Sequence, residues 1–242
     1  MLTYNIHHGA DATNRPDLPR IAATIAGAEP DLVCLQEVDR RWGRRSLHAD
    51  QIAELSERLG MQAHFRAALT RGTDGRYGNA VLSPHPVTAS AGVWLPTPAG
   101  LEPRRAAVAR VALPSGPVTA VSVHLTVGPR LREVRTEQQH RLVELLSTLD
   151  GPVVVAGDFN TGRTRRDLSV LNSALRYARP RRPSPRHWSA LWGRPAGATH
   201  PVRWPTRRID RVYVSAEWTV VTVRVLPSRA SDHRALLAVL RT

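Results

Sequence analysis

Short polar clusters follow apolar runs at six places in this sequence of 242 residues. They are Asn5-Ile6-His7-His8, Gln36-Glu37, His124, Gly157-Asp158-Phe159-Asn160, Asp210 within Arg208–Tyr213, and Ser231-Asp232-His233-Arg234. One such cluster alone is typical of a turn or a helix cap, because Asn and Asp favour both positions. Together the clusters indicate a site for acid–base or metal chemistry, because functional side chains collect at strand ends on a rigid scaffold.

Short strands and amphipathic helices must position these clusters. The hydrophobic pattern predicts strands at 2–6, 32–35, 80–82, 108–113, 118–125, 153–156, 210–214 and 219–225, and helices at 17–28, 48–59 and 131–149. A last apolar run covers 235–240. Residues 219–225 alternate, which predicts that Val221, Val223 and Val225 share one face.

The order of these elements favours an α+β fold, with packed sheets and outer helices, over a doubly wound parallel sheet. Some strands follow one another directly, whereas helices separate others. No internal repeat and no dividing linker is visible, so we expect one domain over residues 1–242.

The segments TYNIHHG, LQEVD, SVHL, GDFN, RIDRVYVS and SDHR resemble the endonuclease/exonuclease/phosphatase superfamily, which has the DNase I-like fold. They stand in that family's order from Thr3 to Arg234. The resemblance implies a four-layer α/β/β/α sandwich of two mostly antiparallel sheets with helices outside. It also implies a divalent-metal phosphoesterase whose site lies at one end of the sheets.

Metal ligands follow from this resemblance and from the chemistry of the residues. Glu37 comes after a buried strand and supplies a hard anionic oxygen, and Mg²⁺ prefers one or two carboxylates together with waters and the substrate phosphate. We therefore expect Glu37 to bind Mg²⁺, with Mn²⁺ as the alternative ion, and Asn5 to contribute to the metal site beside it. In the family Asp232 is a further ligand of the metal or of its water. His7 stands where some family nucleases carry an acid, which leaves a second metal open.

Acid–base roles are implied for five residues. The family uses Asp158 to orient or deprotonate the attacking water, and Asn160 to contact the phosphate or a metal-bound water. It pairs Asp210 with His233, and an adjacent carboxylate raises the pKa of an imidazole and keeps it charged. His124 matches the position where family nucleases place a His or Tyr on the phosphate.

Other matches are less specific. Gly78-Asn79-Ala80 and Glu102-Pro103-Arg104 resemble segments that line the family's cleft, so Asn79 and Arg104 are candidate substrate contacts, or simply a turn and a solvated charge. Thr199-His200-Pro201 stands where many relatives carry Thr-aromatic-Pro, and His200 departs from that pattern. We expect Cys34, in a buried strand, to be a core residue.

Positive charge is unevenly distributed. All 34 basic residues are arginine, which a GC-rich genome can explain, but such a genome does not explain the net charge of +14. Residues Thr161–Ile209 hold 12 arginines and one acid, a net of +11, whereas the remainder holds 22 basic and 19 acidic residues. Such a concentration favours an anionic partner such as nucleic acid, phospholipid or a phosphorylated metabolite. Trp188, Trp192 and Trp204 lie among these arginines and suit either base stacking or a patch under an irregular loop.

Several classes are excluded by composition. A single cysteine excludes an internal disulfide and a four-cysteine zinc site. No run of 18 apolar residues predicts a transmembrane segment, and no signal peptide is visible. We therefore expect a cytoplasmic monomer, while a start codon upstream of this first strand could add an export signal.

The function expected from the sequence is metal-dependent hydrolysis of a phosphate ester by in-line attack of water, with DNA or RNA as the first candidate substrate. The alternative is a phosphodiesterase or phosphatase on phospholipid headgroups, inositol phosphates or other small phosphoesters. A third hypothesis, an inactive binding module, predicts at least one substituted site residue, and every expected acid and histidine is present.

Overall fold

Two six-stranded sheets form the centre of the protein in a computed structural model that describes residues 1–162, 164–179 and 197–242. The first sheet has the order β11 (Thr219–Val225), β12 (Leu236–Arg241), β1 (Leu2–Asn5), β2 (Val33–Arg40), β4 (Gly75–Ser83) and β3 (Gln62–Arg71). The second has the order β5 (Val87–Leu95), β6 (Arg104–Leu113), β7 (Gly116–His124), β8 (Val153–Asp158), β10 (Asp210–Val214) and β9 (Arg176–Tyr177). Only β1–β2 and β7–β8 pair in parallel among the described strands, so the mostly antiparallel sheets expected from the sequence are confirmed.

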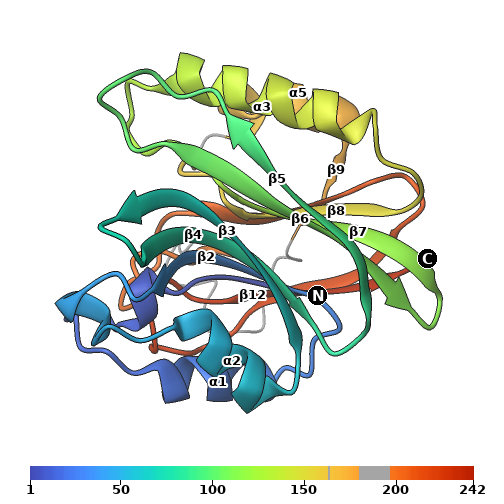
Figure 1. Cartoon of the computed structure of the whole chain (residues 1–242). Helices are drawn as coiled ribbons and strands as arrows, with labels where there is room; N and C mark the ends of the chain where they lie inside the picture. The colour runs from blue at the N-terminus through green and yellow to red at the C-terminus, as the bar shows by residue number, and fades with distance from the viewer. Residues whose placement is uncertain (163, 180–196) are drawn as a thin grey trace.

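Helices cover the outer faces of the sheets, as Figure 1 shows. Helices α1 (Leu18–Ala26) and α2 (Gln51–Leu59) lie on the first sheet, and α3 (Arg132–Leu146) and α5 (Ser169–Ala174) on the second. Among the described residues, the remaining elements are three short helices, η1 (His7–Gly9), η2 (Arg44–Ser46) and α4 (Thr164–Asp167). The expected four-layer α+β sandwich is confirmed. In the described part of the chain, we find no helix with the length and apolar character that a membrane crossing requires.

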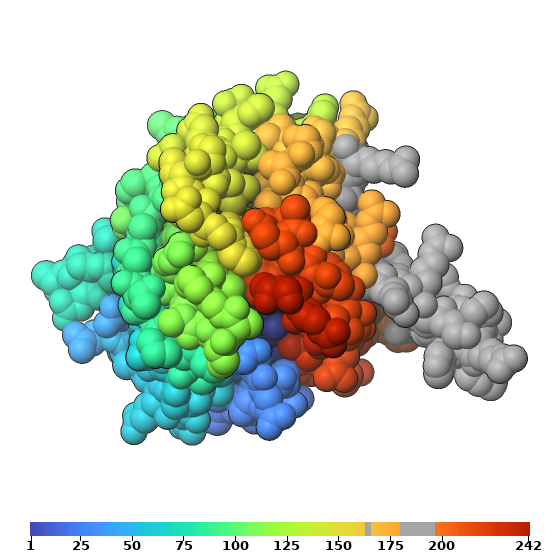
Figure 2. Space-filling view, turned by 90° about the vertical axis from the view of Figure 1, so that its right-hand side faces the viewer, coloured from blue at the N-terminus to red at the C-terminus, as the bar shows by residue number. Residues whose placement is uncertain are grey.

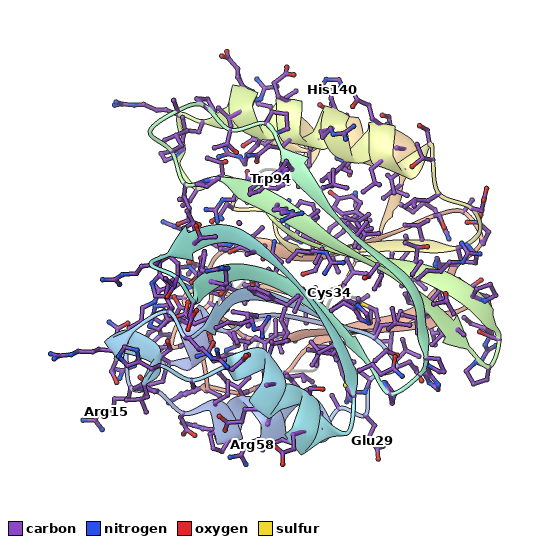
Figure 3. The ribbon with its side chains drawn as sticks, viewed as in Figure 1. Arg15, Glu29, Cys34, Arg58, Trp94 and His140 are labelled. Carbon is purple, nitrogen blue, oxygen red and sulfur yellow. The ribbon has the colours of Figure 1, made fainter. Side chains whose placement is uncertain are left out.

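Alternation of side chains along the strands builds three apolar layers. Leu35 faces α1 and α2, whereas the preceding Cys34 faces the second sheet (Figure 3). Val154 lies in that same layer between the sheets, and Val155 lies under α3. Central strands with both faces covered read as continuous apolar runs, which is why the sequence identified them. Cys34 is a core residue, as expected.

Two features of the sheets differ from the sequence prediction. The edge strands β3, β5 and β9 were not predicted, because most of their residues are partly or fully exposed and their hydrophobic pattern is weak. In β11 the pairing register shifts between Val220 and Thr222. This bulge turns Val220 toward the core and leaves Val221 42% exposed, so Val223 and Val225 share the predicted face whereas Val221 does not.

Both chain termini lie at one end of the sandwich, and the η1 turn that follows β1 lies at the other (Figure 1). Figure 2 looks onto the end with the termini, where the C-terminal segment lies beside the turn between β6 and β7. The polar clusters of the sequence gather at the opposite end, where β1, β7 and β8 end and β10 begins.

Candidate active site

Three neighbouring strands of the second sheet bring three site residues into one row. His124 is the last residue of β7 and pairs in register with Asp158, the last residue of β8. Asp158 in turn pairs with Asp210, the first residue of β10. Residues separated by 34 and 52 positions therefore become direct neighbours through strand pairing alone. All three side chains are buried.

Glu37 reaches the site because β2 carries a bulge. The register with β4 shifts between Leu35 and Val38, and Glu37 adopts a left-handed backbone with φ of 58°. A bulge re-aims a side chain out of the regular alternation of a strand, and a left-handed backbone is unfavourable for a residue with a Cβ. The fold therefore stores strain at this carboxylate, and strain of this kind clusters at functional sites.

Asn5 links carboxylates from the two sheets. Its amide nitrogen donates to Glu37 Oε1 at 2.9 Å and to Asp158 Oδ2 at 3.3 Å, while its Oδ1 accepts from the backbone N–H of His7 at 3.1 Å. Asn5 thus lies beside Glu37, as the sequence predicted. In this arrangement it holds the two carboxylates in place through its amide nitrogen.

A chain of hydrogen bonds fixes His233. Thr199 Oγ1 donates to Asp210 Oδ2 at 2.5 Å, and the same oxygen lies 2.8 Å from His233 Nδ1. Nε2 of His233 points to Asp158 Oδ2 at 3.7 Å. Burial opposes the charged imidazole, but the charge and hydrogen bond of Asp210, with the charges of Asp158 and Asp232, outweigh it and raise the pKa of His233 to about 10. His233 is therefore a cation at neutral pH.

Asp158 lies at the centre of the cluster and is 1% exposed. Burial first, and then the charge of Asp210, raise the pKa of Asp158 to about 7. Burial likewise raises the pKa of Glu37, opposed by its hydrogen bond from Asn5. The ionised form of both carboxylates is therefore unfavourable unless a cation lies close to them.

The pKa of His124 is shifted in the opposite direction to that of His233. Its Nδ1 lies 3.1 Å from Arg104 Nη1, which also donates to Glu102 Oε1 at 2.5 Å. Burial and then the charge of Arg104 hold the pKa of His124 well below its usual value, so the ring is neutral. Because a guanidinium can only donate, Nδ1 accepts and the proton lies on Nε2, 3.8 Å from Asp158 Oδ2.

A second group surrounds Asp232. His7 Nδ1 lies 4.0 Å from Asp232 Oδ1, and His200 Nε2 lies 3.9 Å from Asp232 Oδ2. The His200 ring packs on that of His233 with centroids 4.6 Å apart. His200 thus occupies a place beside the imidazole of His233 that an aromatic residue also suits.

The two remaining asparagines lie differently. Asn160 lines the cleft with a left-handed φ of 51°, and its side-chain amide donates to the carbonyl of Leu125 at 2.9 Å. Its backbone N–H donates to Asp158 Oδ1 at 2.8 Å and helps to orient that carboxylate. Asn79 is buried in β4, where its amide donates to the carbonyl of Arg105 at 2.8 Å. This hydrogen bond of Asn79 joins the two sheets. Contact between Asn79 and a substrate stays a prediction.

These residues surround a cleft of about 500 Å³. The sequence identified Glu37, Arg104, His124, Asp158, Asn160 and His233 in its wall. It missed Trp42, Arg45, Tyr77 and Arg207. Arg45 lies over the rings of Trp42 and Tyr77 at 5.2 and 5.3 Å, and holds the buried Asp39 at 2.7 Å. Nothing in the spacing of these residues marks them, because the η2 turn and β4 bring them together only in the fold. Trp188 and Trp192 lie outside the described residues.

The donor set fits a divalent cation. Carboxylates of Glu37 and Asp158 converge on one amide group, and Asp210 Oδ1 is buried without a hydrogen-bond partner. Carboxylate oxygens of Asp158 and Asp210 lie within 4.8 Å of one another, whereas the protonated His233 beside them has no lone pair to offer an ion. Hard oxygen donors of this kind suit Mg²⁺ or Mn²⁺.

Comparisons with known proteins agree with this geometry. The model of the Endonuclease/Exonuclease/phosphatase family matches residues 2–233. The chain is 34% identical to the uncharacterized protein YbhP of Escherichia coli K12, over 98% of this chain and 94% of that protein. It superposes on an endonuclease/exonuclease/phosphatase from Beutenbergia cavernae with a TM-score of 0.77 and 28% identity, over 99% of this chain and 70% of that one. The fold is also that of the human Nocturnin catalytic domain, with a TM-score of 0.72 and 23% identity, over 99% and 92% of the two chains.

Proposed function

This chain belongs to the endonuclease/exonuclease/phosphatase family, and we propose that it is a divalent-metal-dependent nuclease. Members of the family are hydrolases that act on phosphoesters and are generally dependent on divalent metals. The observation that carries the nuclease proposal is the wall of the cleft. Arg45, Arg104 and Arg207 surround the carboxylates there, and Trp42 and Tyr77 add aromatic surface. Guanidinium groups suit a phosphate backbone, and aromatic rings suit unstacked bases.

In this proposal Glu37 is the principal metal ligand, with Asn5 beside it, and Asp232 offers a further oxygen to the ion or to its water. When bound, the ion neutralises negative charge on the phosphate and polarises the P–O bond. His233 donates from Nε2 to a phosphate oxygen, because Asp210 holds its Nδ1. The neutral His124 donates from Nε2 to a second oxygen. Both donors are fixed before the substrate arrives, so stabilising the developing charge needs little reorganisation.

Asp158 is the base for the attacking water in this proposal. Its raised pKa makes it a stronger base than an exposed aspartate, and its position between His124 and His233 places it against the phosphate. Water attacks phosphorus as its proton passes to Asp158, and the bond to the leaving oxygen breaks on the opposite side. That oxygen takes its proton from solvent or from a histidine, and no covalent enzyme intermediate forms.

Nicking of supercoiled plasmid by the purified protein tests this function. We expect relaxation that requires Mg²⁺ or Mn²⁺, stops with EDTA, and falls at least about 10²-fold in Asp158→Asn. Asp150→Asn, an exposed acid after α3, is the matched control and should keep full activity. If the folded protein leaves plasmid and RNA intact yet hydrolyses bis(p-nitrophenyl) phosphate or an inositol phosphate, the substrate is a small phosphoester and the nuclease proposal is wrong.

A further inference from the structure

A second hollow of about 510 Å³ lies beside the catalytic cleft. Its wall contains Arg20, Arg203, Arg229 and Arg234, with Asp11 as its acid and Trp204 as its aromatic residue. Arg20, Arg203 and Arg229 have exposed side chains. The indole-bearing Trp204 is 67% exposed, although it is a large apolar residue. We call this hollow the arginine pocket.

The arginine pocket and the catalytic cleft are adjacent, and residues that line one contact or neighbour residues that line the other. Arg234 follows His233 directly, and consecutive Cα atoms lie about 3.8 Å apart. Val202 lies two residues after His200, and its N–H donates to the carbonyl of Asp232 at 2.7 Å. On the other side, the carbonyl of Asp11 contacts Nδ1 of His7 at 3.2 Å. Asp232, with His7 and His200 on either side of it, therefore lies between the cleft and this pocket.

Charge in the arginine pocket favours an anion. Four arginines and one aspartate line it, so the charged residues of its wall are mainly positive. That carboxylate is turned to its own loop, since Asp11 Oδ1 accepts from the N–H and Oγ1 of Thr13, both at 2.7 Å, and from the N–H of Arg15 at 3.1 Å. Figure 3 shows this loop, marked by Arg15, projecting from the end of the molecule that carries η1.

The exposed Trp204 indicates which kind of anion the arginine pocket suits. A free phosphate needs only the guanidinium groups, whereas a phosphate joined to a planar base also uses an exposed indole. Membrane insertion would need a wider apolar surface around Trp204. The other apolar side chains of the pocket are Ala12 and Val202, and Val202 is buried.

We propose that the arginine pocket is a nucleotide subsite, which binds the phosphate and base next to the phosphodiester held in the cleft. This inference rests on the proposed nuclease function and adds the direction in which the strand leaves the site. Arg203 and Arg229 contact the phosphate, and Trp204 stacks on the base.

Binding of a fluorescent single-stranded ten-nucleotide DNA in EDTA, where no cleavage occurs, tests the subsite. Arg203→Gln/Arg229→Gln should weaken binding about tenfold, and should lower the slope of log affinity against log salt by about 0.7, the value for one phosphate that is no longer neutralised. Arg58→Gln/Arg141→Gln removes the same charge from exposed positions of α2, where Figure 3 marks Arg58, and of α3, and should change neither value. Quenching of indole fluorescence by the oligonucleotide should disappear in Trp204→Phe.

Kinetics separates this inference from the function on which it rests. With Mg²⁺, the double variant should raise KM for the oligonucleotide about tenfold, with kcat unchanged and with unchanged hydrolysis of bis(p-nitrophenyl) phosphate. Equal oligonucleotide affinities for the double variant and its control would overturn the subsite. So would a loss of binding confined to anionic phosphatidylserine vesicles, which would make the pocket a lipid contact. A wild-type protein that cleaves no phosphodiester would refute the nuclease proposal alone, because the measurement in EDTA does not depend on it.

Discussion

At the scale of single residues, the environments in this site shift the pKa values of neighbouring groups in opposite directions. His233 and His124 flank the same carboxylate of Asp158, yet Asp210 keeps the first protonated and Arg104 keeps the second neutral. Pairs of titratable groups with separated pKa values mark acid–base sites. The sequence alone supplied the residue types, but not the charges.

Asp210→Asn should lower kcat by about 10²- to 10⁴-fold with bis(p-nitrophenyl) phosphate at saturating metal. The amide removes the negative charge that keeps His233 a cation. Thr199→Ala, which removes only the hydrogen bond to Asp210, should lower kcat by no more than about tenfold. Thr136→Ala on the exposed face of α3 is the control for the loss of a hydroxyl. Wild-type kcat in Asp210→Asn would contradict the role of the Asp210–His233 pair.

The sequence indicated which residues gather at the cleft, while their catalytic roles stay predictions. Glu37, Asp158, Asp210 and His233 all lie at or around the cleft, because each lies within or next to a buried strand: Glu37 at a bulge in β2, Asp158 at the end of β8, Asp210 at the start of β10 and His233 shortly before β12. Arg45 and Trp42 could not be found this way, since a turn outside the sheet delivers them. Asn79 lies in a segment that resembles the family, but this resemblance did not predict that its amide donates to the backbone carbonyl of Arg105.

At the scale of elements, the strands that carry the chemistry are those with buried neighbours on both faces, and these were predictable. Edge strands β3 and β5 and the bulge at Glu37 were not, because exposed strands lack apolar alternation and a bulge depends on the partner strand. Helix α2 was foreseen from its apolar face and its terminal Gly60, which has a left-handed φ of 61°.

The start of α2 should show a defined pH dependence. Asp50 Oδ1 accepts from the N–H of Ala53 at 3.3 Å, and Arg40 donates to both oxygens of Asp50 at 2.9 and 2.7 Å. Burial opposes the charge, but these bonds outweigh it and lower the pKa of Asp50 below its usual value of 3.8. The stabilisation is therefore present above that value and is lost as the pH falls through the folded pKa.

Asp50→Asn should destabilise the protein by about 1 kcal/mol at pH 7, and the difference should shrink below about pH 4. Urea denaturation of both proteins across this range measures it. Asp150→Asn serves again as the exposed control, with no difference at either pH. A constant difference between pH 7 and pH 3 would show that the charge of Asp50 does not contribute.

At the scale of the whole molecule, the site exists only where the two sheets meet. Glu37 and Asn5 come from the first sheet, and His124, Asp158 and Asp210 from the second. Deep between the sheets, the Gln36 amide donates to Ser122 Oγ at 2.9 Å, and that hydroxyl donates to the carbonyl of Leu35 at 2.9 Å. Gln36, which the sequence grouped with Glu37, therefore ties the sheets together.

Ser122→Ala should destabilise the protein by about 1–3 kcal/mol, because it leaves the buried amide of Gln36 without that acceptor. Ser173→Ala on the exposed face of α5 should change the free energy of unfolding by less than about 0.5 kcal/mol. Urea denaturation distinguishes the two variants. Equal stabilities would mean that apolar packing alone sets how the sheets dock.

The strained bulge at Glu37 places stability and activity in opposition. Glycine would adopt its φ of 58° without strain, and an amide would avoid a charge among the site's other acids. A library of variants selected only for heat resistance in EDTA would therefore lose this carboxylate early, and its winners would be inactive. In the proposed function a bound ion would reverse this ranking, because it would compensate the charge of Glu37 that the metal-free protein must tolerate. Any programme to engineer a more durable form of this enzyme should therefore select with the ion present.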